Sequence, residues 1–137
     1  MACPYFYPTE RLEQNGWPHP SRLPLGDGFA GTCRADPAHD FHASETTQRE
    51  YCNLGYARGH CYRFPQDGPD AVRFTVAGEQ DGRVQIDWVL EKGHRPYQHG
   101  LLEYDAAQRV FLASPSSPLV KRQAEAYVES YLRRKAL

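Results

Sequence analysis

The sequence has no long hydrophobic run and no strong excess of charge of one sign. No apolar stretch approaches the ~20 residues that a membrane-spanning helix needs, and the opening MACPYFYPTERLEQ lacks the basic and apolar segments of a secretory signal. Lys and Arg number 16 against 17 Asp and Glu, a net charge of −1, so bulk electrostatics do not favour nucleic acid or an acidic membrane as a partner. We therefore expect a cytoplasmic protein with no membrane partner.

The sequence also lacks a convincing nucleotide or serine-nucleophile motif. PLGDGFAGTC formally contains G-x-G-x-x-G at Gly26, Gly28 and Gly31, but prolines occupy both flanks, in WPHPSRLPL and in RADP. A dinucleotide fingerprint works only between a buried strand and a helix, and proline disfavours both. No Gly-Lys-Ser/Thr follows, and there is no G-x-S-x-G. We interpret GDGFAG as a loop that delivers Cys33, with a plain surface turn as the alternative.

Residues 65–137 contain no cysteine, and all four cysteines of the chain lie in residues 1–64. We expect two regions that together form one compact domain: a cysteine-rich metal- or cluster-binding region at 1–64, and a regular region at 65–137. The first is irregular, with prolines, glycines and aromatics and one predicted helix at 44–54. Ser44 or Thr47 could cap that helix and Gly55 end it.

The second region has the alternation of an antiparallel sheet. Apolar residues recur at every second position in VRFTV and RVQIDWVLE, and Asp81-Gly82 between them predicts a hairpin. Two further strands are expected at 97–104 and 108–114, followed by a helix capped by Ser117. The fold class is therefore α+β: an irregular cysteine-rich half with one helix, then a four-stranded antiparallel meander and a C-terminal helix.

The candidate site consists of Cys3, Cys33, Cys52 and Cys61, spaced C-x29-C-x18-C-x8-C. Thiols stay reduced in the cytoplasm, and four thiolates are the ligand number of a tetrathiolate metal site. Such a site would also stabilise a region that has little core of its own. Two alternatives stay open: four reduced cysteines that pack as small apolar residues, and two disulfides in an exported protein.

We favour a 4Fe–4S cluster over zinc. Structural zinc prefers ligands paired on tight turns, and no two cysteines here are that close, whereas a cubane takes one thiolate per iron. Four engaged thiolates leave no open position for a substrate, so electron transfer or redox and oxygen sensing is expected rather than catalysis. Cys3, near a chain end, is the ligand expected to detach most easily. The rival interpretation is a zinc-stabilised module that binds a protein partner through its sheet or through the hairpin at 94–99.

Other polar clusters have simpler interpretations. His39 and His42 fit a solvated loop, and His60, next to Cys61, is at most an indirect contributor to the site because adjacent side chains point apart. The basic C-terminal residues match the dipole of a helix end. These features do not favour a nucleic-acid partner.

Overall fold

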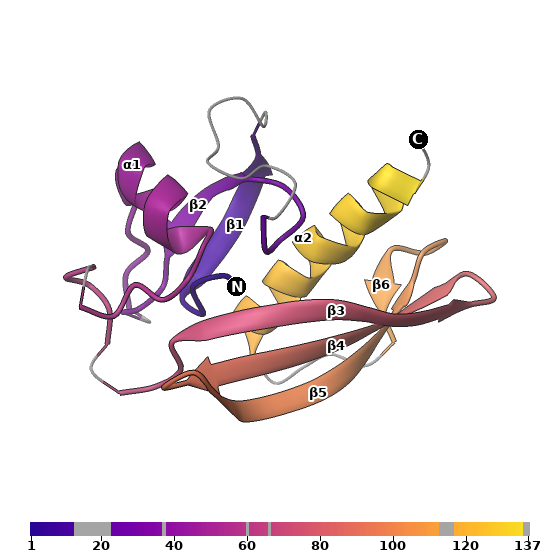
Figure 1. Ribbon diagram of the computed structural model, residues 1–137. Helices are drawn as coiled ribbons and strands as arrows, with labels where there is room; N and C mark the ends of the chain where they lie inside the picture. The colour runs from indigo at the N-terminus through magenta and orange to yellow at the C-terminus, as the bar shows by residue number, and fades with distance from the viewer. Residues whose placement is uncertain (13–22, 37, 60, 66, 113–116, 136–137) are drawn as a thin grey trace.

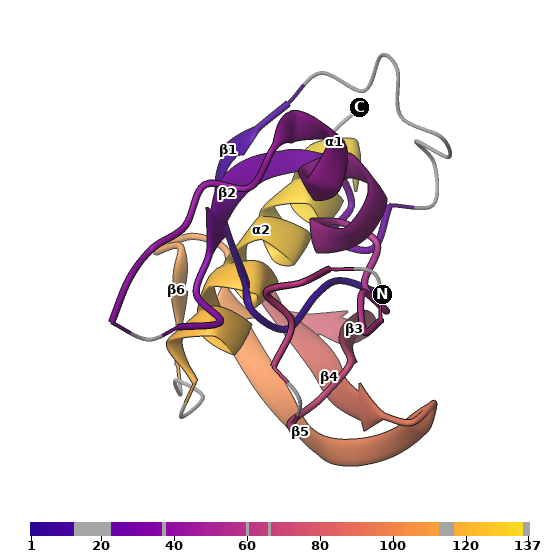
Figure 2. The ribbon, with the colours of Figure 1, turned by 90° about the vertical axis from the view of Figure 1, so that its left-hand side faces the viewer.

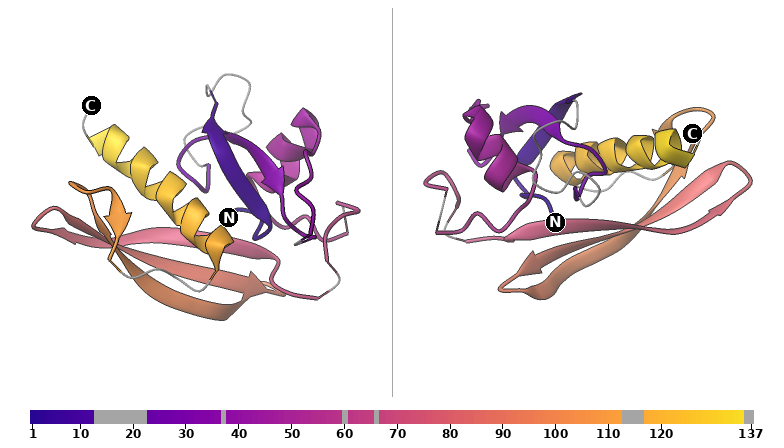
Figure 3. Two further views of the ribbon diagram at one scale, coloured as in Figure 1. Left: turned by 180° about the vertical axis from the view of Figure 1, so that it is seen from behind. Right: turned by 45° about the horizontal axis from the view of Figure 1, so that its top comes forward.

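The computed structural model describes residues 1–12, 23–36, 38–59, 61–65, 67–112 and 117–135. A four-stranded antiparallel sheet forms one layer, and the C-terminal helix α2 lies over one of its faces together with a small two-stranded sheet (Figures 1 and 3). The α+β class with a four-stranded antiparallel sheet and a C-terminal helix is confirmed. No helix in the described part of the chain is long and apolar enough to cross a membrane.

The large sheet is a meander in chain order. It comprises β3 (Ala71–Gln80), β4 (Arg83–Lys92), β5 (Arg95–Asp105) and β6 (Val110–Phe111). Asp81 and Gly82 both have positive φ, 54° and 77°, as a two-residue hairpin of the predicted type requires. The β5 strand extends beyond the expected 97–104, whereas β6 is shorter than 108–114, of which 113 and 114 lie outside the described residues.

Helix α2 (Pro118–Lys135) begins where the sequence predicts. The Ser117 hydroxyl accepts the Val120 N–H at 3.3 Å. The helix buries a broad face, including the polar Gln123 and Ser130, because it packs against both β4 and β1. The opposite face of the large sheet exposes Arg73, Asp87 and His99.

The N-terminal region is more regular than its sequence indicates. Strands β1 (Phe6–Arg11) and β2 (Phe29–Cys33) pair antiparallel, with a register shift between Pro8 and Glu10. The expected helix at 44–54 is a short α1 (Glu45–Thr47) that continues as π-helix η2 (Gln48–Cys52). Ser44 caps it by accepting the Thr47 N–H at 3.1 Å, and Gly55 ends it with φ 76°. Figure 2 shows α1 and the following loop on the same side of the molecule as the N-terminus.

One hydrophobic core draws on both regions. Ala2, Phe6 and Leu25 from the first are buried in the same cluster as Val72, Ile86 and Val128 from the second. Ala2 and Val72 also exchange two backbone hydrogen bonds of 2.8 Å each. The N-terminal segment thereby adds to the open edge of β3 and brings Cys3 to the boundary between the regions.

Candidate metal centre

All four cysteines line a single cavity of about 240 Å³. They come from four separate segments: the chain start, the end of β2, the end of η2 and the loop before β3. All four are free thiols. The remaining wall is mostly apolar and aromatic, with Tyr5, Phe6, Phe41, Tyr51, Ala57 and Phe64 among its residues.

Backbone hydrogen bonds fix the segments that carry the cysteines. The Cys3 N–H donates to the Cys52 carbonyl at 3.1 Å, which joins two of the segments directly. Cys33 exchanges hydrogen bonds of 2.7 and 3.0 Å with Phe41, and the Cys61 N–H donates to the Ala57 carbonyl at 2.8 Å. The cysteines therefore sit on a framework that does not depend on their side chains.

Helix α2 contributes a positioning residue from the far end of the sequence. The amide of Gln123, fully buried, donates to the carbonyls of Cys3 and Phe6 at 2.8 and 2.7 Å. These bonds hold the turn between Cys3 and β1 against the helix. The apolar periodicity of the helix gives no signal for this residue, because it marks the apolar positions only.

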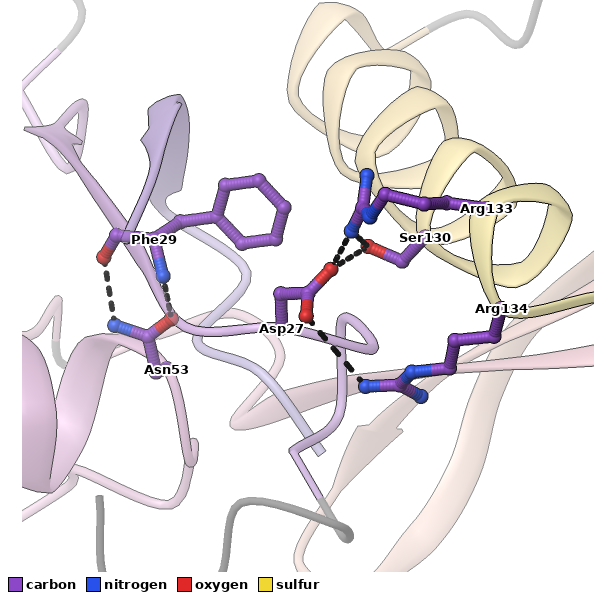
Figure 4. A network of polar contacts seen from close by, with 6 residues as sticks. All are labelled: Asp27, Phe29, Asn53, Ser130, Arg133 and Arg134. Atoms are coloured by element: carbon purple, nitrogen blue, oxygen red, sulfur yellow. Dashed lines mark hydrogen bonds and ion pairs between the residues drawn. The ribbon is translucent and has the colours of Figure 1, made fainter. Parts of the chain in front are cut away.

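Asn53 fixes β2 against the π-helix. Its side-chain amide accepts the Phe29 N–H and donates to the Phe29 carbonyl, both at 3.0 Å (Figure 4). It also donates to the Gln48 carbonyl at 2.8 Å. Phe29 begins the strand that ends at Cys33, and Asn53 follows Cys52. One buried side chain thus sets the spacing of two cysteine-bearing elements.

The segment before β2 is tied to the basic end of α2. Buried Asp27 accepts the Ser130 hydroxyl at 2.7 Å, bonds Arg133, and lies 3.6 Å from Arg134 (Figure 4). Lys135 in turn pairs with Glu79 of β3. Each of these basic residues thus pairs with a carboxylate of the same chain.

Arg58 and Asp70 anchor the loop that carries Cys61. Arg58 bonds the Asp70 carboxylate and donates to the carbonyls of Pro65 and Gly68 at 2.9 and 3.1 Å. The other carboxylate oxygen of Asp70 accepts the Gly93 N–H at 2.7 Å. The loop is thereby fastened to the turn between β4 and β5.

Burial separates the four thiols into two pairs. Cys3 and Cys52 are each 8% exposed, whereas Cys33 and Cys61 are half-buried. Burial raises the pKa of the Cys3 thiol, and burial with the neighbouring thiols of Cys33 and Cys61 raises the pKa of Cys52 to about 12. Without a cation in the cavity, the two deep thiols are protonated at neutral pH.

Cys3, which the sequence predicts to be the most easily detached ligand, is buried. Cys3 is held by both Cys52 and Gln123. The half-buried Cys33 and Cys61 lie nearer to solvent, so the structure does not show the mobile chain end on which the expected lability of Cys3 rested. The cavity opens beside them at Tyr62, whose side chain is 87% exposed.

The four thiols share the wall of one cavity but do not form a compact set of ligands. In the described part of the chain, no three or more His, Cys, Asp or Glu side chains form a group that could hold a metal ion. A zinc ion needs four sulfurs at about 2.3 Å from one point, a geometry that these thiols do not form. Soft thiolates in an apolar shell suit iron–sulfur clusters.

The remaining candidates lie elsewhere. His39 and His42 are exposed, as expected of a solvated loop, and His60 lies outside the described residues. The sequence GDGFAG is only partly a loop: Gly26 adopts φ 87°, but Phe29–Cys33 is a strand, so Cys33 is delivered by β2.

Comparisons with protein-family models, curated proteins and solved structures find no match.

Proposed function

We propose that Cys3, Cys33, Cys52 and Cys61 hold a 4Fe–4S cluster and that the protein acts in electron transfer or in redox or oxygen sensing. The observation that carries this proposal is that the four cysteines of the chain, on four separate segments, line one cavity. Such a cluster supplies reversible electron transfer when bound. The proposal goes with a reducing compartment such as the cytoplasm, because thiols stay reduced and free for ligation there.

The cavity wall supports the same proposal. Its apolar and aromatic side chains exclude water, which protects a cluster and tunes its potential. Arg63 also lines the cavity, and its cation would offset part of the negative charge of four thiolates. With all four thiols engaged, no metal position is open to a substrate, which favours an accessory redox protein over an enzyme.

The test is anaerobic purification followed by a visible absorption spectrum, with iron, sulfide and zinc assayed on the same sample. The expected result is a brown protein with about four iron and four sulfide per chain. The Cys33→Ser and Cys61→Ser variants should lose colour, whereas Tyr62→Ala at the cavity mouth should keep it. Colourless protein with about one zinc would instead support the zinc-stabilised binding module, and absence of both metals would return the cysteines to ordinary packing residues.

A further inference from the structure

The turn between β4 and β5 carries an exposed basic surface, which we call the basic tip and define as residues 92–99, KGHRPYQH. All eight residues are exposed. The stretch contains two cations, Lys92 and Arg95, and two histidines, but no Asp or Glu. Tyr97 adds an aromatic ring, 52% exposed, with the Lys92 ammonium 5.5 Å from its centre.

The two cations face each other across the hairpin. Lys92 and Arg95 are cross-strand partners on either side of the Gly93-His94 turn. Like charges directly opposite each other on a sheet are destabilising. Within the described residues, neither cation forms a salt bridge. The fold therefore holds a repulsive pair that an external anion would relieve.

Two carboxylates beside the tip, those of Asp70 and Glu91, have partners within the fold. Asp70 accepts the Gly93 N–H at 2.7 Å and pairs with Arg58. Glu91 accepts the hydroxyl of Tyr56. These bonds fix the shape of the turn and leave Lys92 and Arg95 directed to solvent.

We propose that the basic tip docks an acidic surface of a partner protein, with Lys92 and Arg95 receiving its carboxylates and Tyr97 supplying apolar contact. A nucleic-acid partner is less favoured, because the net charge is −1 and the other cluster of cations, at the end of α2, pairs with Asp27 and Glu79. This docking role does not depend on what the thiol cavity holds.

The basic tip is also joined to the loop that carries Cys61. The rings of Tyr56 and His94 stack with centres 4.6 Å apart and an interplanar angle of 12°. Both residues adopt positive φ, 55° and 62°, a conformation that is uncommon outside glycine. A partner on the basic tip would therefore sit against residues in direct contact with the segment between Cys52 and Cys61.

The test measures fluorescence anisotropy of a labelled oligoglutamate peptide titrated with the full-length protein. Binding is expected at about 20 mM NaCl and should weaken at about 200 mM, where screening is stronger. The double variant Lys92→Glu/Arg95→Glu should raise the Kd about tenfold or more. The matched control Arg11→Glu/Arg109→Glu removes the same charge from two other exposed sites and should bind as the wild type does.

Three results would overturn the proposal. The wild type could fail to bind the peptide, or both double variants could weaken binding equally, which would mean a bulk-charge effect. A labelled DNA duplex could bind more tightly than the peptide and displace it, which would point to nucleic acid. If circular dichroism shows that the charge reversal disturbs the fold, Lys92→Gln/Arg95→Gln replaces it, with a smaller loss of binding expected.

Discussion

A single buried amide, that of Asn53, holds two cysteine-bearing segments together. Asn53→Ala removes the partners of the Phe29 N–H and carbonyl in a site that is 1% exposed. Each buried polar group left unpaired costs about 1–3 kcal/mol. We expect the free energy of unfolding, measured in urea, to fall by about 2–4 kcal/mol.

A second side chain that bonds the backbone of β2 provides the matched control. The exposed hydroxyl of Thr9 donates to the Ala30 carbonyl at 3.2 Å. Because water can replace this partner, Thr9→Ala should change the free energy of unfolding by about 0.5 kcal/mol or less. If Asn53→Ala lowered the free energy of unfolding no more than Thr9→Ala does, the Asn53 amide would not be what fixes β2.

Gly31 allows the two strands of the small sheet to approach closely. A Cβ at this position would lie 2.1 Å from the Tyr7 carbonyl oxygen and 2.8 Å from the Pro8 Cα, both backbone atoms of the opposite strand. Gly31→Ala must therefore push β1 and β2 apart, and we expect it to destabilise the protein by about 1–3 kcal/mol in urea unfolding.

Gly78 of β3 is the control for that substitution. A Cβ there would meet only the Gln85 Oε1 at 3.5 Å, an ordinary contact, and no positive φ is required. Gly78→Ala should be neutral or slightly stabilising, by up to about 1 kcal/mol. Equal destabilisation by both alanines would mean that the close approach at Gly31 has no energetic consequence.

At the scale of elements, the attachment of the Cys61 loop to the large sheet depends on the charge of Asp70. Burial by itself raises the pKa of Asp70, but the hydrogen bonds from Gly93 and Arg58 outweigh it, and the pKa lies below its ordinary value of 3.8. A carboxyl with a lowered folded-state pKa adds stability above its unfolded pKa and loses it as the pH falls through the folded one.

Asp70→Asn keeps the size of the side chain and removes the charge. We expect it to lower the free energy of unfolding by about 1–3 kcal/mol at pH 7, because a charge-assisted bond to Arg58 is lost. The difference in free energy of unfolding between wild type and variant should disappear as the pH falls below 3.8. Urea midpoints across this pH range measure the effect, and a gap that persists or widens in acid would contradict it.

The β4–β5 hairpin contains the repulsive pair of the basic tip. Lys92→Glu converts it into an opposite-charge pair with Arg95, which should raise the free energy of unfolding by about 0.2–1 kcal/mol. The same change should weaken binding of the oligoglutamate peptide. A variant that gains stability while losing binding would show that the like-charge pair is maintained for recognition; a variant that loses stability would contradict the assigned repulsion.

The elements differ in how far the sequence predicts them. Strict alternation and the Asp81-Gly82 turn predict β3 and β4, and Ser117 marks the start of α2. The sequence does not predict the β1–β2 pair, because a proline, a bulge at Pro8 and a glycine at position 31 interrupt its alternation. The sequence predicts an ordinary helix over 48–52, because residue type does not distinguish it from the π-helix, in which the Asn53 N–H bonds the Gln48 carbonyl.

At the scale of the whole molecule, tertiary packing brings all four cysteines to the wall of one cavity. Their spacing predicts a shared site but does not say which elements deliver them. Cys3 is placed through Gln123, which is 120 residues away in the sequence, and Cys61 through Asp70 and its contact with Gly93. These long-range polar contacts have no local pattern, so the sequence alone could not predict the geometry of the cavity or the depth of Cys3 within it.

If the cavity holds the proposed cluster, the shared core determines how the cluster-bound protein unfolds. Cys3 lies next to Ala2, which is hydrogen-bonded to Val72 of the large sheet, and Gln123 of α2 holds the Cys3 carbonyl. The thiol cavity therefore cannot open fully without disturbing the sheet and the helix.

In an anaerobic urea titration, loss of cluster absorbance and loss of far-ultraviolet circular dichroism should share one midpoint. Because metal binding contributes to folding free energy, protein stripped of iron should unfold at a lower urea concentration, again in one transition. Colour that disappears well before the dichroism signal would contradict this coupling and show that residues 1–64 open independently of the sheet.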